Sequence, residues 1–408
     1  MTSTAPVRRT QPVAPRALPA AVAPATVAAS TTRRAPAAKA PAPVKEEPRE
    51  IEATMKAINK RFGNQTVITA DGQRQPWRIP SGIFTLDLAL LGGIPHNRVT
   101  MFHGPRSSGK TTAAEKCIAG AQRSMPGSQA AFIDVEHTRD AEWGAKLGVN
   151  NRDLIYANPE TGENAVDILD ALMGSKEISL ILLDSIAALV PMKEISSSAE
   201  DAHVGLQSRM VSAMTRKITA ALLRERMRGH FVTVLVINQQ RSKIGGWSPN
   251  GDPISLPGGK ALEFTTSVQV GFKNKETSSK DQDGLDTLEF NEHAFKMDKC
   301  KMHAGMRAGE YRLMRRDSKT LNLFEGDIDD AATLLAHAKK IGCFGGGGKA
   351  WTVDVPDFRQ TFGNTDQAIE HLYENPDDYM YLRNHLIADH AVRLKMPQYF
   401  VDYLYGDV

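Results

Sequence analysis

Eight consecutive residues have the spacing of a phosphate-binding loop. They fit the pattern G-x-x-x-x-G-K-[ST], follow an apolar run of strand length and open a helical pattern. Such a loop points backbone N–H groups and a helix N-terminus at an anion, while the lysine adds a mobile positive charge and the threonine hydroxyl can ligate Mg²⁺. The sequence therefore predicts a site for ATP with Mg²⁺. The residues are Gly104, Pro105, Arg106, Ser107, Ser108, Gly109, Lys110 and Thr111.

Two further apolar runs end in carboxylates. ATP hydrolysis at such a loop needs an acid on the metal side and a base that orients the attacking water. The run 180–183 ends in Asp184, which we expect to be the metal-side acid. The run that begins at Phe132 ends with Asp134 and Glu136. We expect Glu136 to activate water, although a solvated loop acid would give the same pattern.

A long helical pattern carries two arginines that suit a phosphate backbone. Arg209 and Arg216 are seven residues apart and therefore share one helix face. A solvated charged face explains this spacing equally well. Residues 244–259, rich in Gly, Pro and Ser around a lone Trp247, form either an ordinary flexible loop or a mobile arm that clasps a nucleic-acid strand.

Two polar groups lie on or after strand-like runs farther along the chain. The run 232–237 leads into the polar segment 238–243, which we expect beside the γ-phosphate. Lys299 and Lys301 alternate on a predicted strand and therefore share one face. By itself this pair indicates only an exposed strand edge.

Strands that alternate with helices must position these residues. This alternation predicts a parallel sheet covered on both faces, followed beyond Phe264 by an antiparallel extension. Residues 330–408 read as a small helical unit that the Gly345–Gly348 run interrupts. The expected strands are Val99–His103, Ala130–Asp134, Leu180–Leu183, Val232–Ile237, Glu289–Met302 and Glu310–Arg315. The expected helices are Thr111–Ser124, Ala165–Met173, His203–Arg228 and a short one from Ile51 to Phe62.

Composition separates an N-terminal tail from a globular remainder. Ala and Pro make up 23 of the first 50 residues, which predicts disorder because such a segment buries little apolar area. It suits a solubilising tail, a basic arm with weak phosphate affinity, or an organellar transit peptide. The remainder of the 408 residues lacks an uncharged run of the roughly 18 residues that a membrane span needs. Three scattered cysteines indicate a reducing compartment, and a net charge of +3 is too small to identify a nucleic-acid binder.

From Met55 to about Leu386 the chain resembles the bacterial RecA-type homologous recombinases. The segments GPRSSGKTT, FIDVEH and LLDSIAAL resemble the family's Walker A loop, catalytic-glutamate segment and Walker B strand. The segments EISSSAEDAHVGLQSRM and INQQRSKIG resemble its first DNA-binding loop and the strand that leads into the second. AINKRFGNQTVI, IPSGIFTLDLAL and LYENPDDYMYLRNHLI are similar to its N-terminal helix, pre-core segment and C-terminal domain.

The resemblance implies a RecA-like P-loop ATPase fold of the α/β class. Its mostly parallel sheet is joined to a short N-terminal helix and strand and to a small α+β C-terminal domain. The implied boundaries are a disordered tail at 1–50, a polymerisation helix and strand at 51–80, an ATPase core at 81–328 and a C-terminal domain at 329–408. DNA-binding loops are implied at about 194–205 and 240–259.

The resemblance also assigns roles residue by residue. It implies that Lys110, Thr111 and Asp184 bind MgATP, with Thr112 and the rest of the loop, and that Glu136 is the general base. Asp140 and Trp143 would flank the adenine, and Gln239 would sense the γ-phosphate. Lys299 and Lys301 would reach across a subunit interface to the neighbour's ATP. The implied DNA contacts are Arg209, Ser212, Arg216, Arg241, Lys243, Trp247, Gly258 and Gly259.

These roles predict an ATP-dependent DNA recombinase. It would form helical homo-oligomeric filaments on single-stranded DNA and exchange strands with double-stranded DNA, in the cytoplasm of a bacterial or phage-infected cell. Organellar targeting is a minor alternative. Two other functions compete with the recombinase interpretation. One is a ring ATPase, a helicase or remodeller, on the same core, and the other is a protein that coats single-stranded DNA and has a vestigial ATPase. Arg106 and Glu263 depart from the family's usual Glu and Lys, which indicates a divergent or virus-encoded member.

Overall fold

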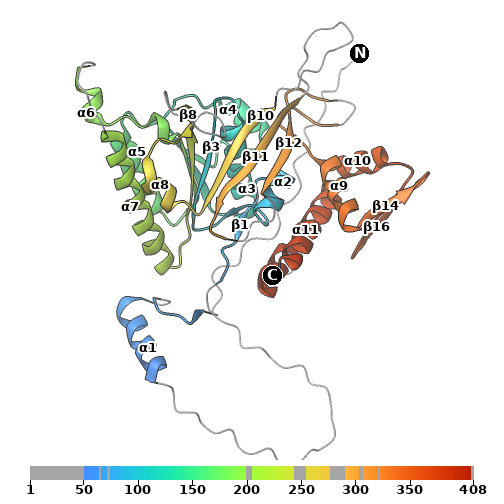
Figure 1. The fold of residues 1–408 in the computed structure, drawn as a ribbon, viewed down its shortest axis with the longest axis horizontal. Helices are drawn as coiled ribbons and strands as arrows, with labels where there is room; N and C mark the ends of the chain where they lie inside the picture. The colour runs from blue at the N-terminus through green and yellow to red at the C-terminus, as the bar shows by residue number, and fades with distance from the viewer. Residues whose placement is uncertain are drawn as a thin grey trace, which may run out of the picture.

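The structure is a computed structural model that describes residues 50–63, 66–70, 74–198, 205–242, 254–275, 290–302, 307–318 and 322–405. Among these residues the centre is a nine-stranded sheet (Figure 1). In spatial order its strands are β13 (Ile328–Asp329), β12 (Ala308–Met314), β11 (Phe290–Cys300), β10 (Val268–Lys275), β3 (Val99–Gly104), β7 (Thr233–Gln239), β6 (Ile178–Asp184), β4 (Gln129–Asp134) and β5 (Leu154–Ala157). The strands from β10 to β5 run parallel, and β11 to β13 continue antiparallel.

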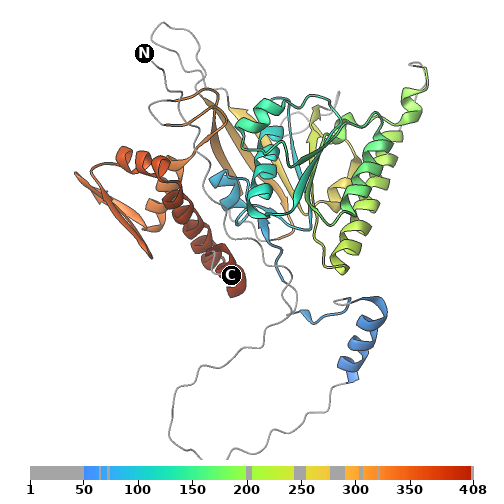
Figure 2. The same ribbon diagram turned by 180° about the vertical axis from the view of Figure 1, so that it is seen from behind.

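Successive residues of the parallel strands point to opposite faces, and helices cover both faces. Phe132 of β4 lies in an apolar cluster with α3 (Lys110–Ser124), whereas the next residue, Ile133, lies in a cluster with α5 (Gly162–Met173) and α7 (Leu206–Met227). This is the period of two expected of strands that are buried on both sides. Figures 1 and 2 show the helix layers from opposite sides.

The sequence predicted the strands β3, β4, β6 and β7 and the long helices, but it missed several short strands and, within the large sheet, also β5 and β10. β5 has only four residues at the sheet edge, and Tyr156 in it is 47% exposed. β10 contains a glycine and ends in Lys273, Asn274 and Lys275, so its strand pattern is weak. The predicted helix 203–228 begins at Leu206, after Gly205 in a left-handed conformation, and ends at Met227; residues 203 and 204 lie outside the described part of the chain.

Short elements complete the core around the large sheet. β1 (Arg78–Ile79) precedes α2 (Phe84–Ala89) in the sequence and β2 (Ile94–Pro95) follows it, and the two strands pair antiparallel. The remaining ones are α4 (Ala141–Lys146), a 3-10 helix (Ile186–Ala188), α6 (Met192–Ile195), β8 (Arg241–Ser242), β9 (Ile254–Ser255) and α8 (Gly259–Thr265). β8 and β9 pair antiparallel, apart from the large sheet.

The C-terminal unit is not the purely helical one that the residue pattern predicted. Residues 345–347 of the glycine run belong to the edge strand of a three-stranded sheet, which forms because Val353, Val355 and Phe362 bury their side chains beneath it. The α+β composition implied by the resemblance is therefore correct. The elements are α9 (Ala331–Ile341), β14 (Phe344–Gly347), β15 (Ala350–Val355), β16 (Phe358–Phe362), α10 (Thr365–Glu374), α11 (Pro376–Arg393) and α12 (Gln398–Tyr405).

Buried polar contacts join this unit to the core. Arg383 of α11 forms an ion pair with Asp87 of α2. Asp330 accepts hydrogen bonds from the backbone N–H of Phe84, at 2.9 Å, and from the Tyr379 hydroxyl, at 2.8 Å. The large sheet ends at Asp329, beside the boundary expected after residue 328.

No residue of helix α1 (Glu50–Phe62) is buried, and Figure 1 shows this helix apart from the large sheet. Ile51 and Phe62, which belong to its apolar face, are each 59% exposed. The expected tail, up to residue 49, lies outside the described residues. In the part of the chain that the structure describes, every helix is too short or too polar to span a membrane.

Candidate active site

The predicted phosphate loop connects the end of β3 to the start of α3. Its backbone takes left-handed conformations at Ser107 and Gly109, with φ of 57° and 84°. Glycine adopts such angles without strain, and Gly109 precedes the first helical residue, Lys110. This turn, followed by a helix N-terminus, is the backbone arrangement that favours an anion.

Lys110 is folded back over this loop. Its Nζ donates a hydrogen bond to the carbonyl oxygen of Pro105 at 2.6 Å and lies 3.4 Å from the Ser108 hydroxyl. Burial lowers the pKa of the ammonium group, although the carboxylates of Asp184 and Glu136 oppose this effect. The positive charge is therefore held inside the turn, where a phosphate group would meet it.

Thr111 and Asp184 form a pair of hard oxygen ligands beside the loop. The Thr111 hydroxyl donates to Oδ2 of Asp184 at 2.7 Å. Burial, with a smaller contribution from the nearby carboxylates Glu136 and Asp134, raises the pKa of Asp184 to about 7, although the Thr111 hydrogen bond opposes this effect. A bound cation would relieve this burial of negative charge, and hydroxyl and carboxylate oxygens are the ligands that Mg²⁺ prefers. The residues present thus fit Mg²⁺.

Glu136 is held by two neighbours at the carboxyl edge of the sheet. Its Oε1 accepts a hydrogen bond of 2.6 Å from Nε2 of Gln239, at the end of β7, and another from the Ser185 hydroxyl. The structure therefore brings together Glu136 and Gln239, the predicted base and sensor. The sequence analysis missed Ser185, whose position directly after Asp184 was the available signal.

Asp134 has a structural role that resolves the ambiguity between the two acids after β4. Its carboxylate accepts the backbone N–H groups of all four residues from 136 to 139 and the hydroxyl of Tyr156. Because these contacts organise the turn, they set the direction in which Glu136 leaves the strand. Of the two acids, Glu136 is the one free to act on a water molecule.

Asp140 and Trp143, expected to flank the adenine, lie at the start of α4. Oδ1 of Asp140 caps this helix by accepting the N–H groups of Glu142 and Trp143. The Trp143 ring is partly buried, and the guanidinium of Arg315 lies 5.0 Å from its centre. The pair thus forms a rigid corner after the Glu136 turn.

The described DNA candidates lie on α7 and α8. Arg209 and Arg216 are exposed on α7, whereas the Ser212 hydroxyl bonds to the Ser208 carbonyl of its own helix at 2.7 Å. Gly258 and Gly259 open α8 with φ of 95° and 65°. Lys243 and Trp247 lie outside the described residues, as do parts of both expected loops, and for Arg241 only the backbone, in β8, is described.

Lys299 and Lys301 are not brought to the phosphate loop of their own chain. Their Nζ atoms donate to consecutive carbonyls near the end of α8, those of Glu263 and Phe264. Lys299 is level with Gln269 on β10, and Gln269 is level with Met101, three residues before the loop begins. Burial and the charge of Lys301 lower the pKa of Lys299. Within its own chain the lysine pair therefore contacts the end of α8.

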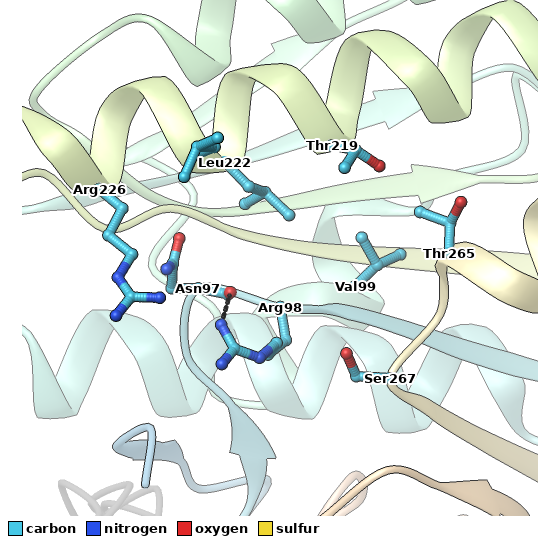
Figure 3. Close-up of a pocket in the computed structure, with 9 residues that line it drawn as sticks. Asn97, Arg98, Val99, Thr219, Leu222, Arg226, Thr265 and Ser267 are labelled. Atoms are coloured by element: carbon cyan, nitrogen blue, oxygen red, sulfur yellow. Dashed lines mark hydrogen bonds between the residues drawn. The ribbon is translucent and has the colours of Figure 1, made fainter. Parts of the chain in front are cut away.

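A separate concavity lies between the start of β3, α7 and the segment that follows α8. Figure 3 shows it, with Arg98, the residue before β3, and Arg226 of α7 approaching each other. Burial lowers the pKa of Arg98, and the positive charge of Arg226 lowers it to a smaller extent. None of the predicted site residues lines this hollow.

A parallel sheet with a phosphate loop after β3 and carboxylates after β4 and β6 defines a P-loop nucleotide-binding core of the RecA type. The chain belongs to the RecA family of homologous recombinases. Residues 49–318 match the family described as the RecA N-terminal domain.

Curated relatives cover most of the chain. The chain is 39% identical to Protein RecA of Paenarthrobacter aurescens, and the matched region covers 73% of the chain and 82% of the relative. It is 42% identical to Protein RecA of Mycobacteroides abscessus, over 66% and 75% of the two lengths. The chain is 36% identical to Protein RecA of Frankia casuarinae, and the matched region covers 81% of the chain and 90% of the relative. The similarity thus extends well beyond the phosphate loop.

Proposed function

We propose that the protein is a DNA-dependent ATPase that forms helical filaments on single-stranded DNA and exchanges strands with homologous duplex DNA. The observation that carries this proposal is the grouping of Lys110, Thr111, Asp184, Glu136 and Gln239 at one edge of the sheet, linked by the contacts from Thr111 to Asp184 and from Gln239 to Glu136. Membership of the RecA family and the bacterial origin of the relatives support it.

Each residue of this group has a separate task in the proposed reaction. Lys110 and the loop N–H groups bind the β- and γ-phosphates, and Asp140 with Trp143 borders the base. Bound Mg²⁺ supplies charge neutralisation between Thr111 and Asp184. Glu136 orients the attacking water and accepts its proton at Oε2, while Gln239 and Ser185 hold the carboxylate in place through Oε1.

Two features support a filament in which the nucleotide lies between protomers. The apolar face of α1 finds no cover within its own described chain, so a second copy is its natural partner. Lys299 and Lys301 present positive charge away from their own phosphate loop. We infer that they reach the nucleotide of the adjacent protomer, so that loss of the γ-phosphate weakens the interface. A head-to-tail interface that does not close produces filaments, whereas a ring requires closure.

DNA contact is proposed along the exposed face of α7, through Arg209 and Arg216, and at the Gly258–Gly259 turn. Exposed arginines on one helix face suit the phosphate backbone and carry little sequence preference. Ser212 is a weaker candidate, because its hydroxyl already bonds within the helix. We propose the bacterial or phage-infected cytoplasm as the place of action, on the strength of the bacterial relatives.

The experiment that tests this function is an ATPase assay with and without single-stranded DNA. Wild-type protein and the control Lys176→Ala, whose lysine is exposed and distant from the loop, should hydrolyse ATP when DNA is added. Lys110→Ala should remain folded but lose hydrolysis and nucleotide-dependent assembly, because it lacks the charge that meets the phosphates. Normal turnover by Lys110→Ala would refute the assignment. Electron microscopy of the same samples separates filaments from rings.

A further inference from the structure

A β-bulge in β11 places Asp298 directly before Lys299. On β10, Gln269 is level with Lys299 and the next residue, Val270, is level with Met297. Asp298 is therefore an extra residue without a cross-strand partner. Bulges of this kind re-aim the side chains beside them. The direction in which Lys299 leaves the strand thus depends on how Asp298 is held.

His103 of β3 holds Asp298 from two strands away. The His103 side chain is almost fully buried, and its Nε2 lies 2.9 Å from Oδ2 of Asp298. Its Nδ1 lies 3.0 Å from Nε2 of Gln240. Because the Gln240 amide donates to Nδ1, we assign the imidazole proton to Nε2, the nitrogen nearest the Asp298 carboxylate. The contact with His103 lowers the pKa of Asp298. These three residues are called the polar relay below.

The intervening strand β10 leaves room for this contact only through a glycine. Gly271 is level with His103 on one side and with Lys296 on the other. A Cβ at this position would lie 2.9 Å from Oδ2 of Asp298 and 3.0 Å from Cε1 of His103. Such distances force the pair to shift. With Gln240 directly after β7, the relay therefore spans four neighbouring strands, β7, β3, β10 and β11.

The two ends of the relay adjoin residues of two different nucleotide sites. Gln240 directly follows Gln239, which bonds to Glu136 in the site of its own chain. Asp298 directly precedes Lys299, which we assign to the neighbour's site. His103 also precedes Gly104, the first residue of the phosphate loop. A movement of the Gln239 segment would thus pull on the bulge that aims Lys299.

We propose that the polar relay couples adjacent nucleotide sites, with His103 and Asp298 as positioning residues for Lys299. This inference rests on the proposed function, because it requires Gln239 to read the γ-phosphate and Lys299 to act across the interface. The coupling makes hydrolysis cooperative in ATP: when one protomer binds ATP, Lys299 is oriented for the next. Coupling free energies between sites commonly correspond to changes of about 5- to 150-fold in affinity.

The test compares DNA-dependent ATPase curves of the full-length protein and its variants. Wild type should have a Hill coefficient for ATP above 1. Asp298→Ala should lower it towards 1 and raise the KM for ATP at least ~5-fold, with a smaller effect on kcat. Asp298→Asn keeps an oxygen acceptor for Nε2–H and should recover most of the cooperativity. Binding of a fluorescent ATP analogue without DNA should be equal in all three, since the relay does not touch the protein's own nucleotide.

Two further variants keep the test decisive if Asp298→Ala is unstable. Gly271→Ala retains all relay residues but separates His103 from Asp298, and it should reproduce the loss of cooperativity. The double variant Gln240→Ala/Asp298→Ala should lose no more cooperativity than the more severe of the two single variants, because both residues act through His103. If the effects of Gln240→Ala and Asp298→Ala on cooperativity are additive, the relay is refuted but the proposed function is not. The same holds if Asp298→Ala and Gly271→Ala both keep the wild-type Hill coefficient. A wild type without DNA-stimulated hydrolysis would overturn the proposed function and the relay with it.

Discussion

Gln239 and Glu136 are joined by a 2.6 Å hydrogen bond across the carboxyl ends of β7 and β4, two strands that β6 separates. The bond holds the predicted base and the predicted sensor in one geometry before any nucleotide arrives. A γ-phosphate that attracts the Gln239 amide must compete with Glu136 for it. In the proposed mechanism, movement of the sensor and release of the base would therefore be one event.

This relationship predicts that Glu136→Gln separates ATP binding from hydrolysis. The amide cannot accept a proton from water, so turnover should fall by about two to four orders of magnitude. Binding should persist because Lys110, Thr111 and Asp184 are unchanged, and filaments on DNA should live longer. ATPase rates and filament lifetimes check this prediction. If the variant hydrolyses ATP normally, the base is another residue.

Arg216→Ala tests the proposed DNA face of α7. The variant should bind all single-stranded sequences more weakly by a similar factor, and the slope of log affinity against log salt should decrease by about 0.7. Arg228→Ala is the matched control, because Arg228 lies just after the other end of the same helix and is ion-paired with Glu225. Fluorescence anisotropy at several salt concentrations measures both. An unchanged affinity, or a loss limited to certain sequences, contradicts a phosphate contact.

The trans role of Lys299 and Lys301 predicts complementation between two inactive proteins. The double variant with both lysines changed to Ala retains an intact phosphate loop, whereas Lys110→Ala retains the lysine pair. Mixed filaments should recover part of the hydrolysis at junctions where the two intact half-sites meet. The ATPase rate of the mixture should therefore exceed the sum of the two separate rates. If both proteins co-assemble on DNA without this gain, the lysines are only an exposed basic edge.

Asp330 predicts a pH dependence at the junction with the C-terminal unit. Burial raises the pKa of this carboxyl to about 6, so its charged form is disfavoured in the folded state. The penalty is full above pH 6 and disappears as the pH falls towards the ordinary carboxyl pKa. Relative to Asp330→Asn, the wild type should gain about 1 kcal/mol in the free energy of unfolding between pH 7 and pH 5. Urea unfolding of both proteins measures it. A constant difference would contradict the buried charge.

The sequence was sufficient to predict the parallel core and the phosphate loop, because long apolar runs and a spaced motif are local signals. β5 could not be predicted, since four residues with an exposed Tyr156 show no clear alternation. The contact between His103 and Asp298 was also beyond reach. It depends on β10 lying between β3 and β11 and on the absence of a side chain at Gly271.

In the candidate site, too, some residues could be predicted from local sequence signals and others could not. Lys110, Thr111 and Asp184 follow from motif and strand end; the side chains of Thr111 and Asp184 are hydrogen-bonded, and that of Lys110 folds over the loop. Ser185 could not be distinguished from an ordinary serine until its hydroxyl was seen on Glu136. The shared face of Lys299 and Lys301 follows from alternation, but their position beside α8 depends on the folding of three strands.

The most direct test of the central claim is a strand-exchange assay between circular single-stranded DNA and homologous linear duplex DNA. With ATP and Mg²⁺, the wild-type protein should produce joint molecules and then nicked circular duplex. Lys110→Ala and a non-homologous duplex should give neither product. Wild-type protein that binds DNA and hydrolyses ATP yet forms no joint molecules, or that unwinds duplex DNA regardless of homology, would contradict the proposed recombinase activity.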